Sequence, residues 1–459
     1  MKIVMKFGGS SVADAARMRA CARIIKAHSG ANSVVAVVSA LDGVTEELLA
    51  LAEAAGAANH PAMGARMKEL RRRHEECGRA LGDGTLPAAL LDQLDHLTFG
   101  ISAVGELTPR SQDAVAAFGE RLSAGLFRRA LELEGVRSRA YTGQEVGLVT
   151  NERFGEAEPL MELSLYQIAE TLRSPLEAGE VPTVTGFIAA TQHGVTTTIG
   201  RGGSDYTATI VGAAVKADEI WIWSDVDGLM SADPRIVPEA RLLERIRFIE
   251  AVEMGLFGAK SMHPRALEPA AERKIPVRMK NTFRPDAPGT LITDEGPEST
   301  DVVRSVLVVK DAALVTVTGA AMMGRPGTAA RIFSLLAEKS VNIKAIILSV
   351  SEAGISFVVA GPQASLARAA LEATMLRSGE ARRVDVEEKV AIVAVIGSNM
   401  KGHPGTAARV FTAVGRDAIN VIAIAQGSSE LSITFMVRAD EGGRAVRALH
   451  QEFLKARGS

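Results

Sequence analysis

Short apolar runs alternate with longer helical patterns from the start of the chain to about residue 290. The runs at 34–38 and 181–188 are apolar at most positions, which is typical of strands covered on both faces of a parallel sheet. Similar strands are expected at 3–5, 196–199 and 219–223. Strands that alternate with helices in this way predict an α/β domain with repeated crossover connections.

One stretch interrupts this alternation. The chain has a helical pattern throughout 46–107, and we expect a helical segment at about 57–105 to which the sequence assigns no role. The run 68–74 within it is strongly basic, and we interpret it as the solvated face of a helical hairpin.

The C-terminal third contains an internal repeat. Residues 324–359 match residues 402–437 at a constant offset of 78 residues. Each copy reads strand, glycine-rich loop, helix, strand, strand, helix, which is most of the βαββαβ order of a ferredoxin-like module. The first copy has a closing strand at about 383–386, whereas a spare strand at 302–309 precedes it. We expect that spare strand to complete the second module's sheet, so that the first module is inserted within the second.

The composition excludes several classes of protein. A net charge of −2 gives no indication of a nucleic acid or an anionic membrane as partner. No apolar run is long enough to span a bilayer, and we expect no signal peptide because the first residues lead straight into a strand. Two distant cysteines, Cys21 and Cys77, predict reduced thiols and a cytoplasmic location. The histidines show no metal-ligand spacing, and we interpret His263 as a structural residue.

Two glycine-rich loops carry the candidate chemistry. Lys6 precedes Gly8 and Gly9 after the first strand, and 200–205 repeats the layout of strand, Gly-Gly, hydroxyl and helix. This layout suits an anion, because glycine lets backbone N–H groups approach a ligand and the helix N-terminus adds partial positive charge. The lysine stands before the glycines, so the first loop is not a Walker A site. Each loop alone also fits a tight turn beside a surface cation.

These loops belong to an ordered set of motifs, which reads KFGGSSV, GERLS, GRGGSD, SDVDG, ADPR and GAK along the chain. The set resembles that of monofunctional aspartate kinases, which have an amino-acid-kinase catalytic domain followed by tandem ACT regulatory modules. The resemblance implies an α/β three-layer fold with a mainly parallel central sheet, plus two C-terminal ferredoxin-like (βαββαβ) ACT modules. The expected domains are the catalytic domain over 1–295, a linker and strand completing the second ACT module over 296–312, the first ACT module over 313–387 and the second over 388–459.

The implied reaction is ATP-dependent phosphorylation of the side-chain carboxylate of L-aspartate to 4-phospho-L-aspartate, the first step toward lysine, threonine and methionine. The nucleophile has an ordinary pKa of roughly 4 and is already ionised, so no general base is needed. The obstacle is repulsion between two anions, and catalysis therefore relies on positioning and on neutralising charge. Lysines, backbone N–H groups and Mg²⁺ meet this need. We expect ATP and Mg²⁺, with the metal held mainly by phosphates and water, and assign no protein ligand to it.

The resemblance also assigns roles to individual residues. Lys6 and Lys260 would neutralise the phosphoryl group from two sides, while Asp205 would orient Lys6 or Arg201, with helix capping as its alternative. Arg201 would pair with a substrate carboxylate and Glu120 with the α-ammonium group. The full ATP-binding set is Lys6, Phe7, Gly8, Gly9, Ser224, Asp225, Met230, Arg235 and Lys260, and the substrate-binding set is Ser39, Thr45, Glu120, Arg201, Gly202, Gly203 and Ser204. The family usually has Thr at 224 and Tyr at 230, so the hydrogen bond or stacking there does not carry over directly.

The ACT modules imply an amino-acid effector, lysine or threonine, and a homodimer formed through these modules. The expected effector contacts are Met323, Gly324, Asn342, Asn420 and Gln426. Two alternatives stay open: a related kinase acting on glutamate, N-acetylglutamate, UMP or carbamate, and a non-enzymatic amino-acid sensor built on an inactive kinase domain. The pair of Glu120 and Arg201 argues against the first, and the two lysines argue against the second.

Overall fold

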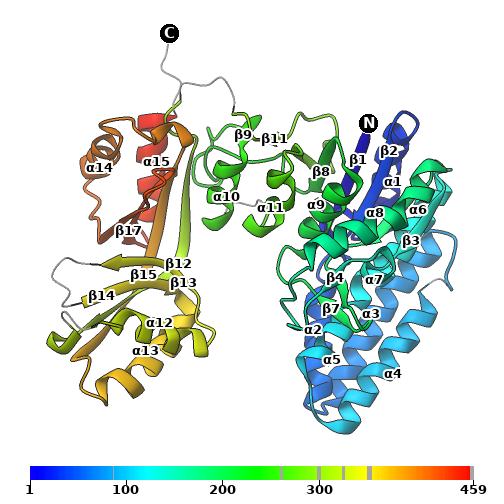
Figure 1. The fold of residues 1–459 in the computed structure, drawn as a ribbon, viewed down its shortest axis with the longest axis horizontal. Coiled ribbons are helices and arrows are strands. Elements are labelled where there is room, and N and C mark those ends of the chain that lie inside the picture. Colours follow the sequence, from blue (N-terminus) through cyan, green and yellow to red (C-terminus); the bar gives the residue numbers. More distant parts are fainter. Residues whose placement is uncertain (86, 259–261, 297–300, 323–325, 349–353, 455–459) are drawn as a thin grey trace. The chain divides into compact units, whose positions relative to one another are not determined.

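The computed structural model describes residues 1–85, 87–258, 262–296, 301–322, 326–348 and 354–454. The chain forms two compact units (Figure 1). The N-terminal unit comprises Met1–Leu229, Glu244–Val252 and Met262–Pro297, and the C-terminal unit comprises Met230–Leu243, Glu253–Ser261 and Glu298–Ser459.

An eight-stranded sheet forms the centre of the N-terminal unit, with the order β3-β5-β2-β1-β8-β10-β11-β9. Every neighbouring pair is parallel except β10 with β11, so the expectation of a mainly parallel sheet is confirmed. The strands are β1 (Lys2–Phe7), β2 (Ser33–Val38), β3 (Ser138–Tyr141), β5 (Val181–Thr185), β8 (Glu219–Ser224), β9 (Arg245–Arg247), β10 (Val277–Asn281) and β11 (Thr290–Thr293).

The alternation of side chains along β1 separates the two faces of this sheet. Ile3, Met5 and Phe7 lie in one hydrophobic core with residues of α1 (Ala15–Ser29) and α6 (Phe118–Leu133). Lys6 points to the opposite face, where it meets Asp205 on α9 (Gly203–Val215). Helices α8 (Met161–Glu177) and α11 (Pro264–Glu272) pack against α9. The catalytic candidate on β1 is therefore separated from the larger aromatic core by the sheet itself.

The stretch 46–107 is helical as expected, but it forms three helices, α2 (Val44–Gly56), α3 (His60–Ala80) and α4 (Ala88–Val104), before α5 (Pro109–Ala116). The interpretation of its basic run as a solvated face is wrong for His74, which is fully buried and bonds the Leu70 carbonyl through Nδ1 at 2.7 Å. Burial lowers the pKa of this histidine to about 4, so it is a neutral core residue.

The expected strand at 181–188 is also divided. It ends at Thr185, and the chain turns at Phe187, whose φ is 64°. The chain then enters a small separate sheet with the order β4-β6-β7, formed by β4 (Val149–Thr150), β6 (Ile188–Thr191) and β7 (Thr196–Thr198). An apolar run alone does not reveal such a turn, because the residues on both sides of it are buried.

The C-terminal unit is built on one six-stranded sheet with the order β13-β14-β12-β15-β17-β16. Two long strands form its centre, β12 (Ser305–Thr318) and β15 (Arg383–Ile396). The first part of β12 pairs with 392–396, next to β17 (Ser432–Arg438), and its second part pairs with β14 (Gly354–Ala360). The spare strand thus pairs within the second repeat, as expected. The outer strands are β13 (Ile343–Leu348) and β16 (Ala423–Gln426).

Each repeat contributes helices and a core of its own to the C-terminal unit. Helices α12 (Thr328–Glu338) and α13 (Ala364–Leu371) cover the first core, and α14 (Thr406–Arg416) and α15 (Gly442–Phe453) cover the second. Ala232 and Val237 of the segment 230–243 are buried in that second core. The segment also receives a hydrogen bond at the Ser231 carbonyl from the N–H of Val306 on β12, at 2.9 Å.

Candidate active site

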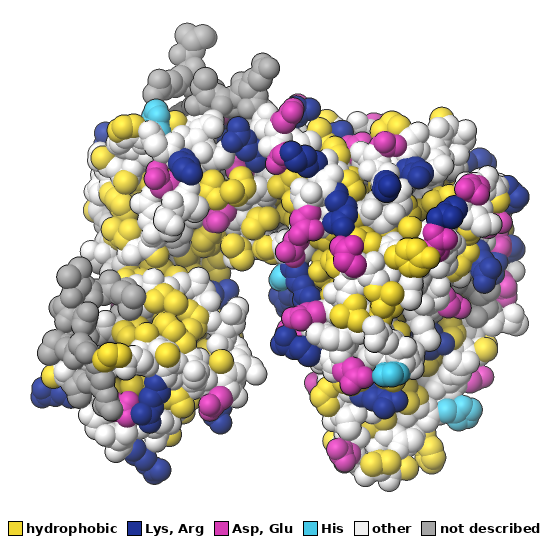
Figure 2. Space-filling view, viewed as in Figure 1, with side chains coloured by type: hydrophobic (Ala, Val, Ile, Leu, Met, Phe, Trp, Pro, Cys, Tyr) yellow, Lys and Arg dark blue, Asp and Glu magenta, His cyan; other side chains and the backbone are white. Residues whose placement is uncertain are grey.

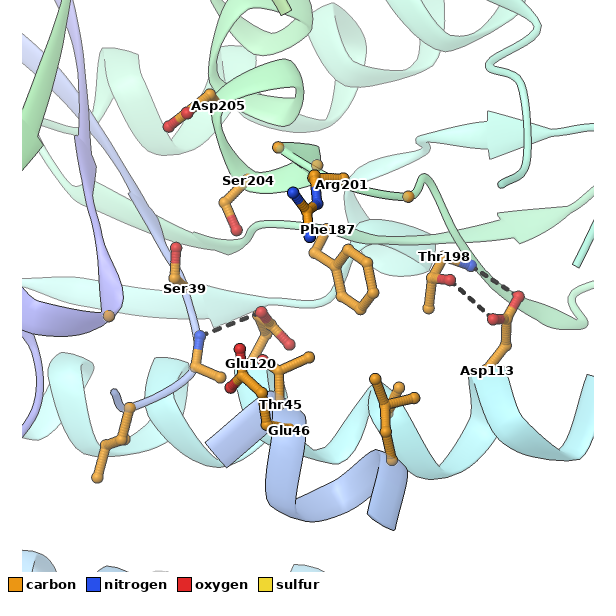
Figure 3. Close-up of a pocket in the computed structure, with 18 of the residues that line it drawn as sticks. Ser39, Thr45, Glu46, Asp113, Glu120, Phe187, Thr198, Arg201, Ser204 and Asp205 are labelled. Carbon is orange, nitrogen blue, oxygen red and sulfur yellow. Dashed lines mark hydrogen bonds between the residues drawn. The ribbon is translucent and has the colours of Figure 1, made fainter. Parts of the chain in front are cut away.

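A cavity of about 580 Å³ lies in the N-terminal unit where β1 and β2 end and α9 begins (Figure 3). Ligands in open α/β sheets bind at the carboxyl ends of the strands, so this position fits a substrate site. The predicted residues that line the cavity come from four separate parts of the sequence: Lys6, Gly9, Ser39, Thr45, Glu120, Arg201, Gly202, Gly203, Ser204 and Asp205. The fold therefore brings together the substrate set and two of the three catalytic candidates, Lys6 and Asp205, which lie 199 positions apart.

Lys6 and Asp205 form the charged pair of this cavity. Lys6 Nζ lies 2.6 Å from Asp205 Oδ1, and both side chains are largely buried. The N-cap of α9 is Gly202, and no side chain caps this helix end. The geometry therefore favours an orienting role of Asp205 toward Lys6 over the alternative of helix capping. The carboxylate keeps the ammonium group at the end of β1, facing the cavity.

The glycines of both loops allow close packing that a side chain would prevent. The N–H of Gly8 donates to the Trp223 carbonyl at 3.1 Å, which joins the first loop to the end of β8. A Cβ atom on Gly9 would lie 3.1 Å from the Ala40 carbonyl oxygen. Gly202 has a φ of 72°, and a Cβ atom there would lie 2.6 Å from that of His263. This last position requires glycine both for its backbone angle and for space.

Glu120 presents an unusual carboxylate to the cavity. It lies in the first turn of α6 and is 3% exposed. Its Oε1 accepts a hydrogen bond from the Ala40 N–H at 3.1 Å, whereas Oε2 is buried and has no hydrogen-bond partner among the described residues. Burial raises the pKa of Glu120 to about 8, with the charge of Lys6 as a smaller opposing effect. A cationic ligand group beside Oε2 would satisfy this acceptor.

Arg201 supplies the opposite charge. Its side chain is exposed, and no ion pair joins it to any residue in the described part of the chain. Figure 3 shows Arg201 and Ser204 from the start of α9, with Ser39 and Thr45 on the facing side of the cavity. Guanidinium and hydroxyl donors on these walls would suit the carboxylates of a small zwitterion.

The cavity lining also includes residues that the sequence did not single out, among them Asp113, Phe187 and Thr198. Phe187 lies in a run that was expected to be a continuous strand, so its turn conformation was hidden. Thr198 lies near the end of the strand expected at 196–199, just before the second loop. This position at the carboxyl end of a strand is the signal that could have identified it as a cavity residue. Asp113 lies on α5 without a distinguishing pattern around it, and no sequence signal marks it.

The predicted nucleotide residues are divided between the two units. The Phe7 side chain is fully buried and stacks on Trp223 at 6.0 Å between ring centroids, so only its backbone could meet a ligand. Ser224 ends β8 and Asp225 follows it, next to Trp223, whose carbonyl is bonded by the first glycine loop. The remaining members divide between other regions: Met230 and Arg235 belong to the C-terminal unit, and Lys260 lies outside the described residues.

Arg235 and Asp227 have local partners. Arg235 forms a forked ion pair with Asp233 at 2.7 Å, and its side chain is 85% exposed. Asp227 accepts hydrogen bonds from Asn281 at 2.8 Å and from Arg284 at 2.6 Å, as expected of a strand-end turn. The described residues contain no group of three or more His, Cys, Asp or Glu side chains that could hold a metal ion.

The candidate effector residues lie in the C-terminal unit. Asn342 and Asn420 are exposed and precede β13 and β16, and Gln426 is exposed at the end of β16. Met323 and Gly324 lie outside the described residues. The equivalent placement of Asn342 and Asn420 reflects the internal repeat.

Charge and hydropathy of the surface agree with the composition. Acidic and basic side chains of the N-terminal unit are interspersed on the face shown in Figure 2. None of the described helices is long and apolar enough to cross a membrane.

Comparisons with known proteins agree with the site and the fold. A model of the amino acid kinase family matches residues 1–281, and a model of the ACT domain matches residues 315–375 and 393–453. Aspartokinase 1 of Arabidopsis thaliana, a chloroplastic protein, is 32% identical over 462 residues, which cover 99% of this chain and 80% of that relative.

Two crystal structures of E. coli aspartokinase III also match. The complex with aspartate and ADP, in the R-state, has a TM-score of 0.85 and 30% identity, over 99% of this chain and 100% of that one. The complex with lysine and aspartate, in the T-state, has a TM-score of 0.82 and 29% identity, over 99% of both chains. The chain belongs to the aspartokinases, enzymes of the amino acid kinase family with tandem ACT domains that phosphorylate the side-chain carboxylate of aspartate with ATP.

Proposed function

We propose that the cavity between Lys6, Glu120 and Arg201 is where this aspartokinase binds L-aspartate and where the phosphoryl group is transferred. The observation that carries the proposal is the convergence of three complementary groups on one cavity. These are the Lys6–Asp205 pair, the exposed guanidinium of Arg201 and the buried Oε2 of Glu120.

Aspartate matches this arrangement group by group. Its α-ammonium would pair with Glu120, and Arg201 would bind one carboxylate through two parallel hydrogen bonds. Ser39, Thr45 and Ser204 would donate hydroxyl hydrogen bonds from the cavity walls. Support comes from E. coli aspartokinase III, which was crystallised with aspartate and ADP and resembles this chain over 99% of its length. N-acetylglutamate, UMP and carbamate have no α-ammonium group to pair with Glu120. Glutamate has one, but its side-chain carboxylate is one methylene further from it.

Lys6 is proposed as the charge neutraliser at the transferring phosphoryl group, with the backbone N–H groups of Gly8 and Gly9 beside it. The attacking carboxylate is already ionised, so the enzyme has to reduce repulsion between two anions. Asp205 acts through Lys6, because it fixes the ammonium group at 2.6 Å. Lys260, which the resemblance places on the other side of the phosphates, stays a prediction.

The nucleotide and metal are part of the same proposal. Ser224 and Asp225 would contact ATP beside the first glycine loop, while Met230 and Arg235 stay predictions from the resemblance. Mg²⁺ would be held mainly by phosphate and water oxygens. When bound, the metal would supply further neutralisation of phosphate charge.

We further propose that the repeats are regulatory and that the domains have the expected limits, 1–295, 296–312, 313–387 and 388–459. Lysine is the favoured effector over threonine, because E. coli aspartokinase III was crystallised with lysine in a T-state. The contacts would include Asn342, Asn420 and Gln426, and a homodimer would form through these modules. The cytoplasmic location stays a prediction, supported by buried free thiols at Cys21 and Cys77.

Steady-state kinetics with coupled ADP detection test the proposal. Lys6→Ala should lower kcat at least a hundredfold while the KM for aspartate changes little, because the ammonium group acts mainly on charge that develops in transfer. Arg201→Ala should raise the KM for aspartate and leave the KM for ATP almost unchanged. An unchanged kcat in the first variant, or an effect confined to ATP in the second, refutes the assigned role.

A substrate and effector panel completes this experiment. Only aspartate should support ATP turnover among aspartate, glutamate, N-acetylglutamate, UMP and carbamate. Turnover with none of them would favour the amino-acid sensor. Lysine should inhibit and raise the melting temperature; if lysine, threonine and methionine all leave activity and melting unchanged, the modules are not effector sites.

A further inference from the structure

The proposed reaction leaves one buried carboxylate in the cavity wall without a role. Asp113 lies on α5 and is 2% exposed. It accepts hydrogen bonds from the Gly155 N–H at 2.9 and 3.0 Å. It also accepts hydrogen bonds from the Thr198 N–H at 3.0 Å and from Thr198 Oγ1 at 2.7 Å (Figure 3). No ion pair joins it to any residue that the structure describes. Burial raises its pKa, whereas these hydrogen bonds oppose the rise.

The two partners of Asp113 belong to segments that lead to the second glycine loop. Thr198 ends β7, only three residues before Arg201. Gly155 lies in the loop between β4 and α8, and this loop is joined to β7 by the Ala157 N–H, which donates to the Thr198 carbonyl at 2.9 Å. Asp113 therefore binds both segments at the point where they meet.

The loop that contains Gly155 also packs on the turn before Arg201. Gly200 has a φ of 76°, and a Cβ atom there would lie 3.5 Å from Glu156 Cγ and 3.6 Å from the Gly155 carbonyl oxygen. Gly200 is thus held from the chain before it, through Thr198, and from the side, through the loop. The carboxylate of Asp113 is hydrogen-bonded to both supports, at Thr198 and at Gly155.

We infer that Asp113 is a positioning residue for aspartate binding, which sets the Gly200 turn and through it the location of the Arg201 guanidinium. The inference rests on the proposed role of Arg201. Asp113 itself contacts neither the phosphoryl group nor the reacting carboxylate in this role. An ionised carboxylate is suited to it, because both of its oxygens only accept hydrogen bonds and three donors converge on them.

Asp113→Asn is the sharpest perturbation. The amide has nearly the same shape, but one acceptor oxygen becomes an NH₂ group that faces the N–H donors of Gly155 or Thr198. We expect the KM for aspartate to rise about tenfold, as for loss of a hydrogen bond to a charged group, while the KM for ATP stays within about twofold. Glu219→Gln is the matched control. It makes the same exchange at a buried carboxylate that is paired with Arg278 and begins β8, at the opposite end of the strand from the first glycine loop.

A double-variant cycle with Arg201→Ala identifies the route. If Asp113 acts through Arg201, Asp113→Asn should change the KM for aspartate less than twofold in the Arg201→Ala background. A merely structural residue would lower the melting temperature and leave this KM unchanged, or would add its full effect in both backgrounds, and either result overturns the inference. An unchanged KM for aspartate in Arg201→Ala alone overturns the proposed function instead.

A second variant covers the case in which Asp113→Asn does not fold. Thr198→Val removes only the Oγ1 donor, and Thr198→Ser retains it. The valine variant should raise the KM for aspartate several-fold above that of the serine variant. Equal KM values for the two variants would overturn the inference.

Discussion

Glu120 gives the most quantitative prediction of this structure, because its carboxylate is buried, half-satisfied and open to the cavity. Its pKa of about 8 means that about one tenth of the free enzyme has an ionised Glu120 at pH 7 and about half at pH 8. If the ionised form binds the α-ammonium of aspartate, kcat/KM for aspartate should rise about fivefold between these pH values. Glu120→Gln should remove this rise and lower kcat/KM.

The same shift predicts a pH-dependent cost in stability. The pKa of Glu120 is raised from its ordinary value of 4.5 to about 8, so the folded state binds this proton more tightly than the unfolded chain. The free energy of unfolding therefore falls as pH rises above 4.5, and it stops falling once the pH is above about 8. Between pH 6 and pH 9 the loss is on the order of 2 kcal/mol. The neutral amide of Glu120→Gln does not titrate, so the stability of this variant relative to wild type should increase as pH rises from 6 to 9.

Two measurements check this reasoning. Initial rates at subsaturating aspartate and saturating ATP from pH 6.5 to 8.5 give the activity profile, and thermal melts over pH 6 to 9 give the stability difference. Glu46→Gln serves as the control, because Glu46 lines the same cavity but is exposed. Its profile should keep the wild-type slope. A flat wild-type profile, or a slope in Glu120→Gln equal to that of wild type, would refute the proposed titration.

Two further predictions concern the second glycine loop and the C-terminal core. Gly202→Ala should reduce activity strongly and destabilise the fold by about 1–2 kcal/mol, because Gly202 has a positive φ and an added Cβ would clash with His263. Gly64→Ala is the control, because Gly64 lies at an open helix position, and it should have neither effect. Full activity in Gly202→Ala would contradict the prediction. Ser231→Ala should lower the free energy of unfolding by about 1–3 kcal/mol, because the buried Nε2 of His450, 3.0 Å from Ser231 Oγ, would lose this hydrogen-bond partner. Thermal or urea unfolding measures the change, and a melting temperature equal to that of wild type would contradict the prediction.

Periodicity and repetition predicted the elements whose patterns are local. The apolar runs of β1, β2 and β8 predicted a parallel sheet, because a strand that is covered on both faces has apolar residues at most positions and is therefore easy to recognise in a sequence. The constant offset of the repeat predicted two modules. The second module lacked one strand, which predicted that 302–309 would pair within it, and 305–309 does pair with 392–396. Such inferences work because each strand must find a hydrogen-bonding partner.

The rest depends on contacts between distant residues, which a single sequence does not record. His74 sits in a basic run and yet is buried, because the helical phase of α3 turns it inward. Asp113 has no local motif, and its meaning comes from donors 42 and 85 positions away. Glu120 was identified through the resemblance, but the unpaired Oε2 and the raised pKa follow only from its surroundings.

Three largely buried carboxylates, Asp113, Glu120 and Asp205, line the cavity that we propose for an anionic substrate. Their charges would repel that substrate, but their partners limit this effect. Asp205 forms an ion pair with Lys6, and Asp113 accepts hydrogen bonds from three uncharged donors. Neither carboxylate therefore faces the substrate without a partner. Of these three, Glu120 is the one that keeps an oxygen without a hydrogen-bond or ion-pair partner among the described residues, and its raised pKa keeps it mostly neutral at pH 7 until a cationic group binds. A substrate with an ammonium group would recover the cost of ionising Glu120, whereas a dicarboxylate without one would not. In the proposed function, selection for an amino acid would therefore follow from the buried carboxylate of Glu120, while Arg201 and Lys6 would attract the anionic groups.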